Sequence, residues 1–297
     1  MQFKPKTKEK LRKAIEKYCE NNNQKYGNIN DWDVSLITDM SKLFFCCDHS
    51  DCNKKIHQFN QPLNNWNVSN VTNMSSMFRN CTEFNQSLNN WNVSNVTNMC
   101  EMFSFCHKFN QPLNNWNVSN VTNMRFMFHV CTEFNQPINN WNVSNVTDMS
   151  SMFCICKEFN QPINNWNVSN VVDMNFMFCY CFAFNQSINN WNVSNVTNMC
   201  YMFYNCNDFS QPLNNWNVSN VTNMSHMFYW CDKFNQPLNN WNVSNVTDVS
   251  SMFSEFNMSY REQFYMINAE KKNKYALHEL QKMMSITNDI NFSVNNN

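Results

Sequence analysis

A tryptophan recurs every 25 residues through most of this chain. The series runs through Trp66, Trp91, Trp116, Trp141, Trp166, Trp191, Trp216 and Trp241. The residues between them are close copies, and the unit from Trp66 reads WNVSNVTNMSSMFRNCTEFNQSLNN. An unbroken period of roughly 20 to 50 residues is typical of proteins in which each coil covers the apolar face of the next. The spacing therefore predicts a solenoid.

The repeats divide the chain into three parts. Nine units, the last incomplete, begin with a longer one of 34 residues at Trp32. We expect an N-terminal capping helix over residues 1–25, a repeat solenoid over 26–256, and a C-terminal helical cap with a disordered tail over 257–297. Caps are expected because an open terminal coil exposes its apolar face to water. Thr7 precedes a helical pattern in which four residues share a face: Leu11, Ala14, Ile15 and Tyr18.

Two periodicities lie within each unit. In the unit from Trp66, four apolar residues follow the i, i+3, i+4, i+7 pattern of a short helix: Met74, Met77, Phe78 and Cys81. Residues 84–88 then resemble a short strand. One strand and one helical turn fit a leucine-rich-repeat coil, and such crossovers wind right-handed. The predicted fold is an α/β, right-handed leucine-rich-repeat-like solenoid of about nine 25-residue coils with helical caps. An all-β helix is the alternative.

Stacked coils would align identical side chains in files. Neighbours in a file should lie about 4.8 Å apart, Trp on Trp and Phe on Phe, with the Gln amides hydrogen-bonded to one another. A cysteine file comprises Cys47, Cys81, Cys106, Cys131, Cys156, Cys181, Cys206 and Cys231. Because every coil carries the same cysteine, we interpret this file as small buried core residues, in preference to a metal or redox ladder.

Composition and charge bound the class of partner. The 297-residue chain has a formal net charge of −1 and an isoelectric point near 6.6, which favours neither nucleic acid nor an anionic membrane. It contains no apolar run of about 18 residues and no N-terminal signal-peptide pattern. Fifteen cysteines without an export signal favour reduced thiols. We therefore expect no membrane span, and a protein that stays in the compartment where it is made.

Variation between the copies is the best indicator of a binding surface. Counted from the tryptophan as position 1, it concentrates at positions 10, 11, 14, 15, 17 and 18. Positions 11 and 15 lie four apart, on one side of the predicted helical turn. They hold Ser76/Asn80, Glu101/Phe105, Phe126/Val130, Ser151/Ile155, Phe176/Tyr180, Tyr201/Asn205 and His226/Trp230. Files of exposed aromatic residues suit protein contact. The candidate binding residues are Phe105, Phe126, Phe176, Tyr180, Tyr201, His226 and Trp230. The alternative is that they pack between neighbouring coils.

One stretch departs from the period. The first unit gains nine residues between Cys47 and Phe59 and contains the sequence CCDHSDCNKKIHQF. Four zinc-competent side chains fall within it in a C-x2-H-x2-C-x4-H spacing: Cys46, His49, Cys52 and His57. The spacing matches no standard zinc finger. We interpret it as a polar insertion loop without a cofactor, with a zinc site as the sharper alternative.

The repeated phrase W-[ND]-V-S-x-[VI]-T-[ND]-M-x-x-[ML]-F-x-x-C-x-x-F-N-Q resembles the BspA-like leucine-rich-repeat surface proteins. That family was first catalogued as a mycoplasma domain of unknown function and is widespread in bacteria, protists and giant DNA viruses. The similarity covers about Tyr26 to Phe256. The abundance of Asn and the missing export signal are more similar to a giant-DNA-virus member than to a bacterial one. The resemblance implies a repeat scaffold, with adhesion or host-protein binding proposed for surface members, and brings no catalytic residues.

These observations favour a non-enzymatic scaffold that binds an unidentified protein, such as a host protein, through its variable helical face. A passive structural protein that self-associates, for example in a virion, is the alternative. We do not expect an enzyme, because the six histidines occupy unrelated repeat positions. The sequence also has no G-x-S-x-G, H-E-x-x-H or phosphate-loop motif.

Overall fold

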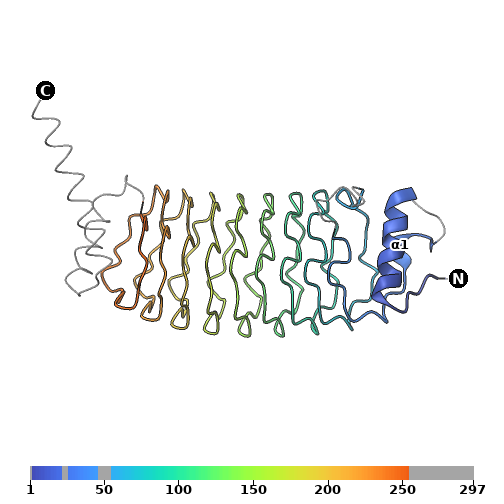
Figure 1. Ribbon diagram of the computed structural model, residues 1–297, viewed down its shortest axis with the longest axis horizontal. Coiled ribbons are helices and arrows are strands. Elements are labelled where there is room, and N and C mark those ends of the chain that lie inside the picture. Colours follow the sequence, from blue (N-terminus) through green and yellow to red (C-terminus); the bar gives the residue numbers. More distant parts are fainter. Residues whose placement is uncertain (1, 22–25, 46–54, 254–297) are drawn as a thin grey trace, which may run out of the picture.

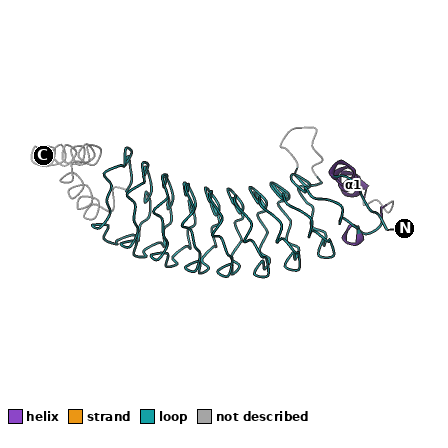
Figure 2. Ribbon diagram, turned by 90° about the horizontal axis from the view of Figure 1, so that it is seen from below, coloured by secondary structure: helices purple, strands orange, loops and turns teal. Residues whose placement is uncertain are grey.

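The computed structural model describes residues 2–21, 26–45 and 55–253. Its coils lie side by side along one axis, with a helix against the N-terminal end (Figure 1). The line of coils is curved when it is seen from below (Figure 2). The C-terminal cap and tail expected over 257–297 lie outside the described residues.

Among the described residues of the N-terminal end, helix α1 spans Lys8–Asn21 and the short 3-10 helix η2 spans Ile29–Asp31. Thr7 caps α1, since its Oγ1 accepts a hydrogen bond of 3.3 Å from the Lys10 N–H. The apolar face of α1 is buried, as the pattern predicts, through Leu11, Ala14 and Ile15. The described coils contain no helix apart from η2.

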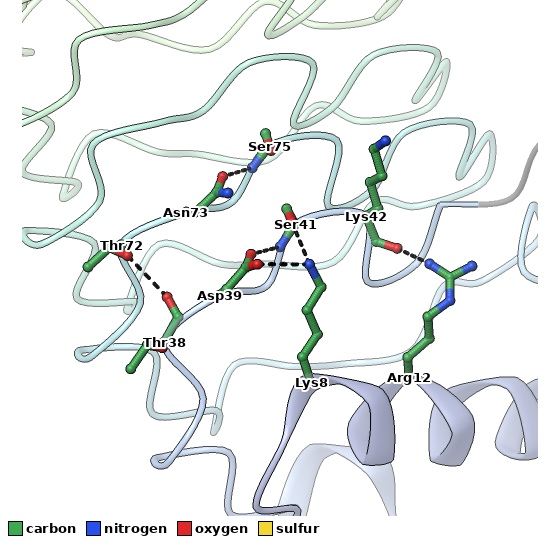
Figure 3. Close-up of polar contacts among 9 residues, drawn as sticks. All are labelled: Lys8, Arg12, Thr38, Asp39, Ser41, Lys42, Thr72, Asn73 and Ser75. Atoms are coloured by element: carbon green, nitrogen blue, oxygen red, sulfur yellow. Dashed lines mark hydrogen bonds and ion pairs between the residues drawn. The ribbon is translucent and has the colours of Figure 1, made fainter.

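Polar side chains of α1 attach it to the first coil (Figure 3). Lys8 Nζ lies 3.0 Å from Asp39 Oδ2, and Arg12 donates to the carbonyl oxygens of Lys42 and Phe45. In later coils the carbonyl at the position of Phe45 accepts a hydrogen bond from the preceding coil, as Ser104 does. The first coil has no preceding coil, so Arg12 satisfies this carbonyl instead.

The helical turn expected over residues 74–81 does not form. The Met77 and Cys81 N–H groups each bond three residues back, whereas the N–H groups of the residues between them alternately cross to the next coil. Phe78 N–H, for example, donates to Met102 O at 2.9 Å. A helix requires every N–H to bond within the segment. Turns with inter-coil bonds bury the same apolar residues, so the spacing predicted their burial and not their backbone conformation.

Continuous strands are also missing from residues 55–253. Isolated parallel bridges join position 8 of successive coils, such as Asn73 with Asn98. The short strand expected over residues 84–88 does not form. The Asn85 N–H bonds to the side-chain oxygen of Asn60 at 2.9 Å, and a side chain thus replaces the backbone partner of a strand. The coil is a series of turns held by its neighbours.

The core consists of stacked files of side chains. Trp116 and Trp141 stack with ring centroids 6.4 Å apart and 4° between their planes. Phe78 and Phe103 stack at 5.7 Å, and both are fully buried. In the file from Trp66 to Trp241, each indole N–H donates to a backbone carbonyl of a preceding coil, and Trp116 Nε1 lies 2.9 Å from Leu88 O. Indole burial therefore leaves no polar atom of these rings unsatisfied.

The glutamine file differs from the expected Gln-to-Gln ladder. Gln111 Nε2 donates to the side-chain oxygen of Asn85 in the preceding coil at 3.0 Å. The same oxygen accepts the Asn110 N–H at 3.0 Å. One asparagine oxygen thus serves two donors of the next coil, and the arrangement recurs along the array. Asparagine suits this role because its short side chain places the oxygen within reach of a backbone N–H of the next coil.

The cysteine file is buried from Cys81 to Cys231, as the repeated pattern predicts, whereas Cys47 lies outside the described residues. Its thiols donate to phenylalanine carbonyls of the preceding coil, for example Cys106 Sγ to Phe78 O at 3.0 Å. From Cys81 to Cys231 these side chains are 0% exposed. Burial raises the pKa of Cys106 and Cys131 well above that of an ordinary thiol. The thiols of this file are inert core groups.

Candidate interaction surface

Positions 11 and 15 have left-handed backbone angles in the described coils. The φ angle is 54° at Ser76 and 66° at Asn80, and the same holds in the later coils. The residues concerned are Lys42, Ser76, Asn80, Glu101, Phe105, Phe126, Val130, Ser151, Ile155, Phe176, Tyr180, Tyr201, Asn205, His226, Trp230 and Ser251. The variable face is thus a face of turns and not the helical face expected from the spacing.

This conformation costs free energy for most of the residues that adopt it. A positive φ at the third residue of a four-residue turn is the type II pattern, which favours Gly or Asn. Another L-residue pays roughly 1–2 kcal/mol there. Only Asn80 and Asn205 carry the preferred side chain at position 15, whereas Val130 and Ile155 are β-branched. Bulky residues occupy these positions despite the backbone cost.

The predicted binding residues are partly accessible. Trp230 is 42% exposed. The remaining six are half-buried: Phe105, Phe126, Phe176, Tyr180, Tyr201 and His226. These side chains are therefore neither fully exposed nor fully buried between coils, and their role in binding stays a prediction.

Five of these residues come together over three successive coils. Phe176 stacks on Tyr201 with centroids 4.6 Å apart, and Tyr201 stacks on His226 at 4.4 Å. Beside this file, Tyr180 contacts Tyr204 at 5.3 Å and Tyr204 contacts Trp230 at 5.6 Å. We name the whole group the aromatic patch: Phe176, Tyr180, Tyr201, Tyr204, His226, Tyr229 and Trp230.

Two members of the patch were missed in the choice of candidates. Tyr204 and Tyr229 occupy position 14, and their rings stack at 5.6 Å with 10° between planes. Position 14 is variable, and it is aromatic in two consecutive coils. That run of aromatic residues is the signal that could have found them.

Phe105 and Phe126 belong to a separate cluster. Both rings lie edge-on to His129, at 5.0 Å and 5.2 Å, and Arg125 lies over the Phe126 ring. Nearer the N-terminus the face becomes polar, where Arg79 Nη1 lies 2.6 Å from Glu101 Oε2. The structure therefore gathers five of the seven predicted residues and places the other two elsewhere on the array.

The aromatic patch favours uncharged side chains. Burial lowers the pKa of His226 below its ordinary value, although Asp248 opposes the shift, so the imidazole is neutral at pH 7. Burial, together with a hydrogen bond to Tyr180, raises the pKa of Tyr204 to about 12. The buried Nδ1 of His226 has no hydrogen-bond partner. The patch presents an apolar surface with a few polar atoms.

The candidate zinc ligands are mostly outside the described residues. Cys46, His49 and Cys52 fall there, whereas His57 is described and its Nδ1 lies 2.8 Å from Asn80 O. Within residues 2–21, 26–45 and 55–253, no group of three or more His, Cys, Asp or Glu side chains could hold a metal ion. The same ranges include no helix long and apolar enough to cross a membrane.

The comparison with protein families agrees with the repeat architecture. A family model described as Mycoplasma protein of unknown function, DUF285, matches residues 11–60, 47–166 and 147–266. The overlapping matches extend from residue 11 to residue 266 of the 297 residues. The chain belongs to the DUF285 family. No curated protein matches it. Three matches to one DUF285 model follow from the repeats, because one model spans several coils.

Proposed function

We propose that this DUF285 protein is a non-enzymatic repeat scaffold that binds a protein partner through the aromatic patch. One observation carries the proposal. Large aromatic residues occupy left-handed positions, where they cost about 1–2 kcal/mol each, although other coils have Ser or Asn at the same positions. Strain of this kind is concentrated at functional positions.

The chemistry of the patch supports a protein as the partner. Tyrosine, tryptophan and phenylalanine offer large apolar areas with little side-chain entropy to lose, and they dominate the energetics of protein interfaces. The stacked rings of Phe176, Tyr201 and His226 are held in place before a partner arrives. Such preorganisation lowers the cost of binding.

The sequence resemblance supports a more specific assignment. We place the chain among the BspA-like leucine-rich-repeat proteins, as a member from a giant DNA virus, with a host protein as the partner. The array is then a right-handed solenoid whose coils use turns where other leucine-rich repeats use helices. A location inside the host cell or in the virion accompanies this assignment.

The test is a binding comparison between variants that keep the coil geometry. The patch variant carries Phe176→Ser, Tyr201→Ser and Trp230→Asn, because Ser76, Ser151, Asn80 and Asn205 occupy the same positions natively. A partner captured from host-cell extract is purified and titrated against both proteins. We expect the patch variant to raise its Kd at least about 100-fold, since hot-spot aromatic residues contribute 2 kcal/mol or more each.

A matched control removes exposed apolar area elsewhere. Leu36 and Val172 are 50% and 45% exposed, and Leu36→Asn with Val172→Thr restores the residues of the other coils. This control should bind as the native chain does. If both variants bind equally well, the patch is not the interface. If the native chain captures no specific partner and its light scattering rises with concentration, the self-associating structural protein is the better assignment.

A further inference from the structure

A second column of variable residues runs through position 14, next to the inert cysteine file. In four successive coils it holds Ser104, His129, Cys154 and Cys179. Ser104 Oγ lies 3.4 Å from His129 Nδ1. The side chain of Cys154 interacts with the Cys179 thiol and with the His129 imidazole, and both interactions lower its pKa. Four chemically active side chains thus form one connected chain across the coils.

The backbone holds the two thiols in register. The Val130 N–H bonds to Cys154 O at 2.8 Å, and the Ile155 N–H bonds to Cys179 O at 2.7 Å. Paired backbones of this kind lie roughly 4.8 Å apart. A disulfide joins cysteines whose Cα atoms are roughly 4.4–6.8 Å apart. The stacking of the coils therefore supplies the geometry that a disulfide needs.

The column differs from the inert file in its environment. Cys156 and Cys181 sit in the same two coils, but they are 0% exposed and donate to phenylalanine carbonyls. Cys154 is 7% exposed and borders the half-buried His129. The hydrogen bonds from Cys179 and from His129 lower the pKa of Cys154, against the opposing effect of burial. A thiolate is the attacking form in disulfide exchange.

We infer that Cys154 and Cys179 are a redox-active pair that forms a reversible disulfide by exchange with a small-molecule disulfide. The Cys154 thiol passes its proton to His129, and its sulfur attacks one sulfur of that molecule. The S–S bond of the small molecule breaks, and the first small thiol leaves with that proton. The Cys179 sulfur then attacks Cys154 Sγ, and the second small thiol leaves with the Cys179 proton. The protein loses two protons and two electrons, which together equal two hydrogen atoms, and the small disulfide is reduced to two thiols.

The experiment uses the full chain and retains only Cys154, Cys179 and the position-16 cysteines from Cys81 to Cys231. Ser replaces Cys19, Cys46, Cys47, Cys52, Cys100 and Cys200. The folded protein is incubated with glutathione disulfide at pH 7, quenched with acid and weighed intact. We expect a loss of the mass of two hydrogen atoms, reversed by dithiothreitol. Cys179→Ala should instead retain a glutathione adduct on Cys154.

Matched variants separate this pair from the neighbouring file. The variants Cys156→Ala and Cys181→Ala each remove one cysteine of the equally spaced buried pair. Both should lose the mass of two hydrogen atoms, as the parent protein with the reduced set of cysteines does. The proposal is overturned if these variants no longer oxidise, or if the parent protein keeps all its thiols. His129→Gln should slow disulfide formation about tenfold, because a less populated thiolate attacks more slowly. An unchanged rate would remove His129 from the mechanism.

Discussion

The contribution of a single residue to this protein depends on both its backbone conformation and its side-chain environment. At position 13, Phe128 is fully buried and stacks on both neighbouring coils. Two residues earlier, Phe126 is half-buried and has a φ of 55°. Both are phenylalanines, yet Phe128 contributes to the core, whereas Phe126 has an unfavourable backbone conformation at the surface.

Val130 offers a direct measurement of this cost. Its φ is 60°, which is unfavourable for a β-branched residue, and the same position holds Asn in two other coils. We expect Val130→Asn to raise the free energy of unfolding by about 0.5–1 kcal/mol, the relieved backbone strain less the lost apolar contact. Urea unfolding measures the change. The control is Val172→Asn at an exposed position without a positive φ, where no gain is expected. A loss of stability in both variants would contradict the prediction that the positive φ of Val130 destabilises the fold.

At the scale of the coil, side-chain amides carry the contacts that strands carry in other proteins. Asn110 Oδ1 accepts the Asn135 N–H at 3.0 Å and Gln136 Nε2 at 2.9 Å. A carboxylate could accept both hydrogen bonds, whereas a methyl group could accept neither. The oxygen, more than the amide nitrogen, is therefore what the coil requires at this position.

Two substitutions at Asn110 test this requirement. Asn110→Ala leaves the Asn135 N–H without its acceptor and should lower the free energy of unfolding by about 1–3 kcal/mol. Asn110→Asp keeps an acceptor and should cost less than half as much. Chemical denaturation of the two variants provides the comparison. Equal losses would mean that the amide nitrogen or the packing of Asn110 matters more than its oxygen.

The coil also marks the limit of what the sequence predicts. The buried residues, including Met74, Met77, Phe78 and Cys81, follow from the pattern, because burial depends on which residues are apolar. The backbone conformation of these residues could not be predicted, because a helix and a pair of turns bury apolar residues at the same spacing. Glycine at Ser76 or Asn80 would have indicated the turns. The aromatic patch was found in part for the same reason: its positions vary visibly, but their contacts depend on the turn geometry.

The contact between the N-terminal segment and the array is also an element-scale feature, and it depends on pH. Lys4 Nζ lies 2.6 Å from Asp33 Oδ2. Hydrogen bonds from Lys4 and then Ser35 lower the pKa of Asp33 to about 2. Because the folded pKa is depressed, the stabilisation is complete above the unfolded value near 4 and is lost as pH falls towards 2.

Asp33→Asn should therefore flatten the acid side of the stability profile. The native chain is expected to lose Tm between pH 4 and pH 2, and the variant should lose measurably less over the same interval. Thermal unfolding followed by circular dichroism gives both profiles, and Lys4→Gln should reproduce the effect. Parallel profiles for native and variant chains would show that the ion pair does not contribute.

The whole molecule behaves as a sum of coils and contacts between neighbours. Each interior coil bonds to the one before it and the one after it, through equivalent atoms at similar distances. In such an array a coil is a unit of stability that can be removed. The register of the remaining coils matters more than their number.

Deletion of residues 117–141 tests this modularity. The deletion joins Trp116 to Asn142, so every remaining residue keeps its position in the repeat. We expect a folded protein with a similar circular dichroism spectrum and a modestly lower unfolding midpoint in urea. Deletion of residues 117–128 shifts the register by about half a coil and should prevent cooperative folding. A register-preserving deletion that unfolds the protein would argue against independent coils.

The tryptophan file has an optical consequence. Trp116, Trp141, Trp166 and Trp191 stand face to face at 6.3 to 6.4 Å with planes within 4° of parallel. Excitation absorbed by one indole can pass to the next at such short range. Because the emitting ring has the orientation of the absorbing ring, this migration should leave the polarisation of the fluorescence nearly intact. Light absorbed by a tryptophan of one coil would then be emitted by a tryptophan of another coil with almost the same polarisation.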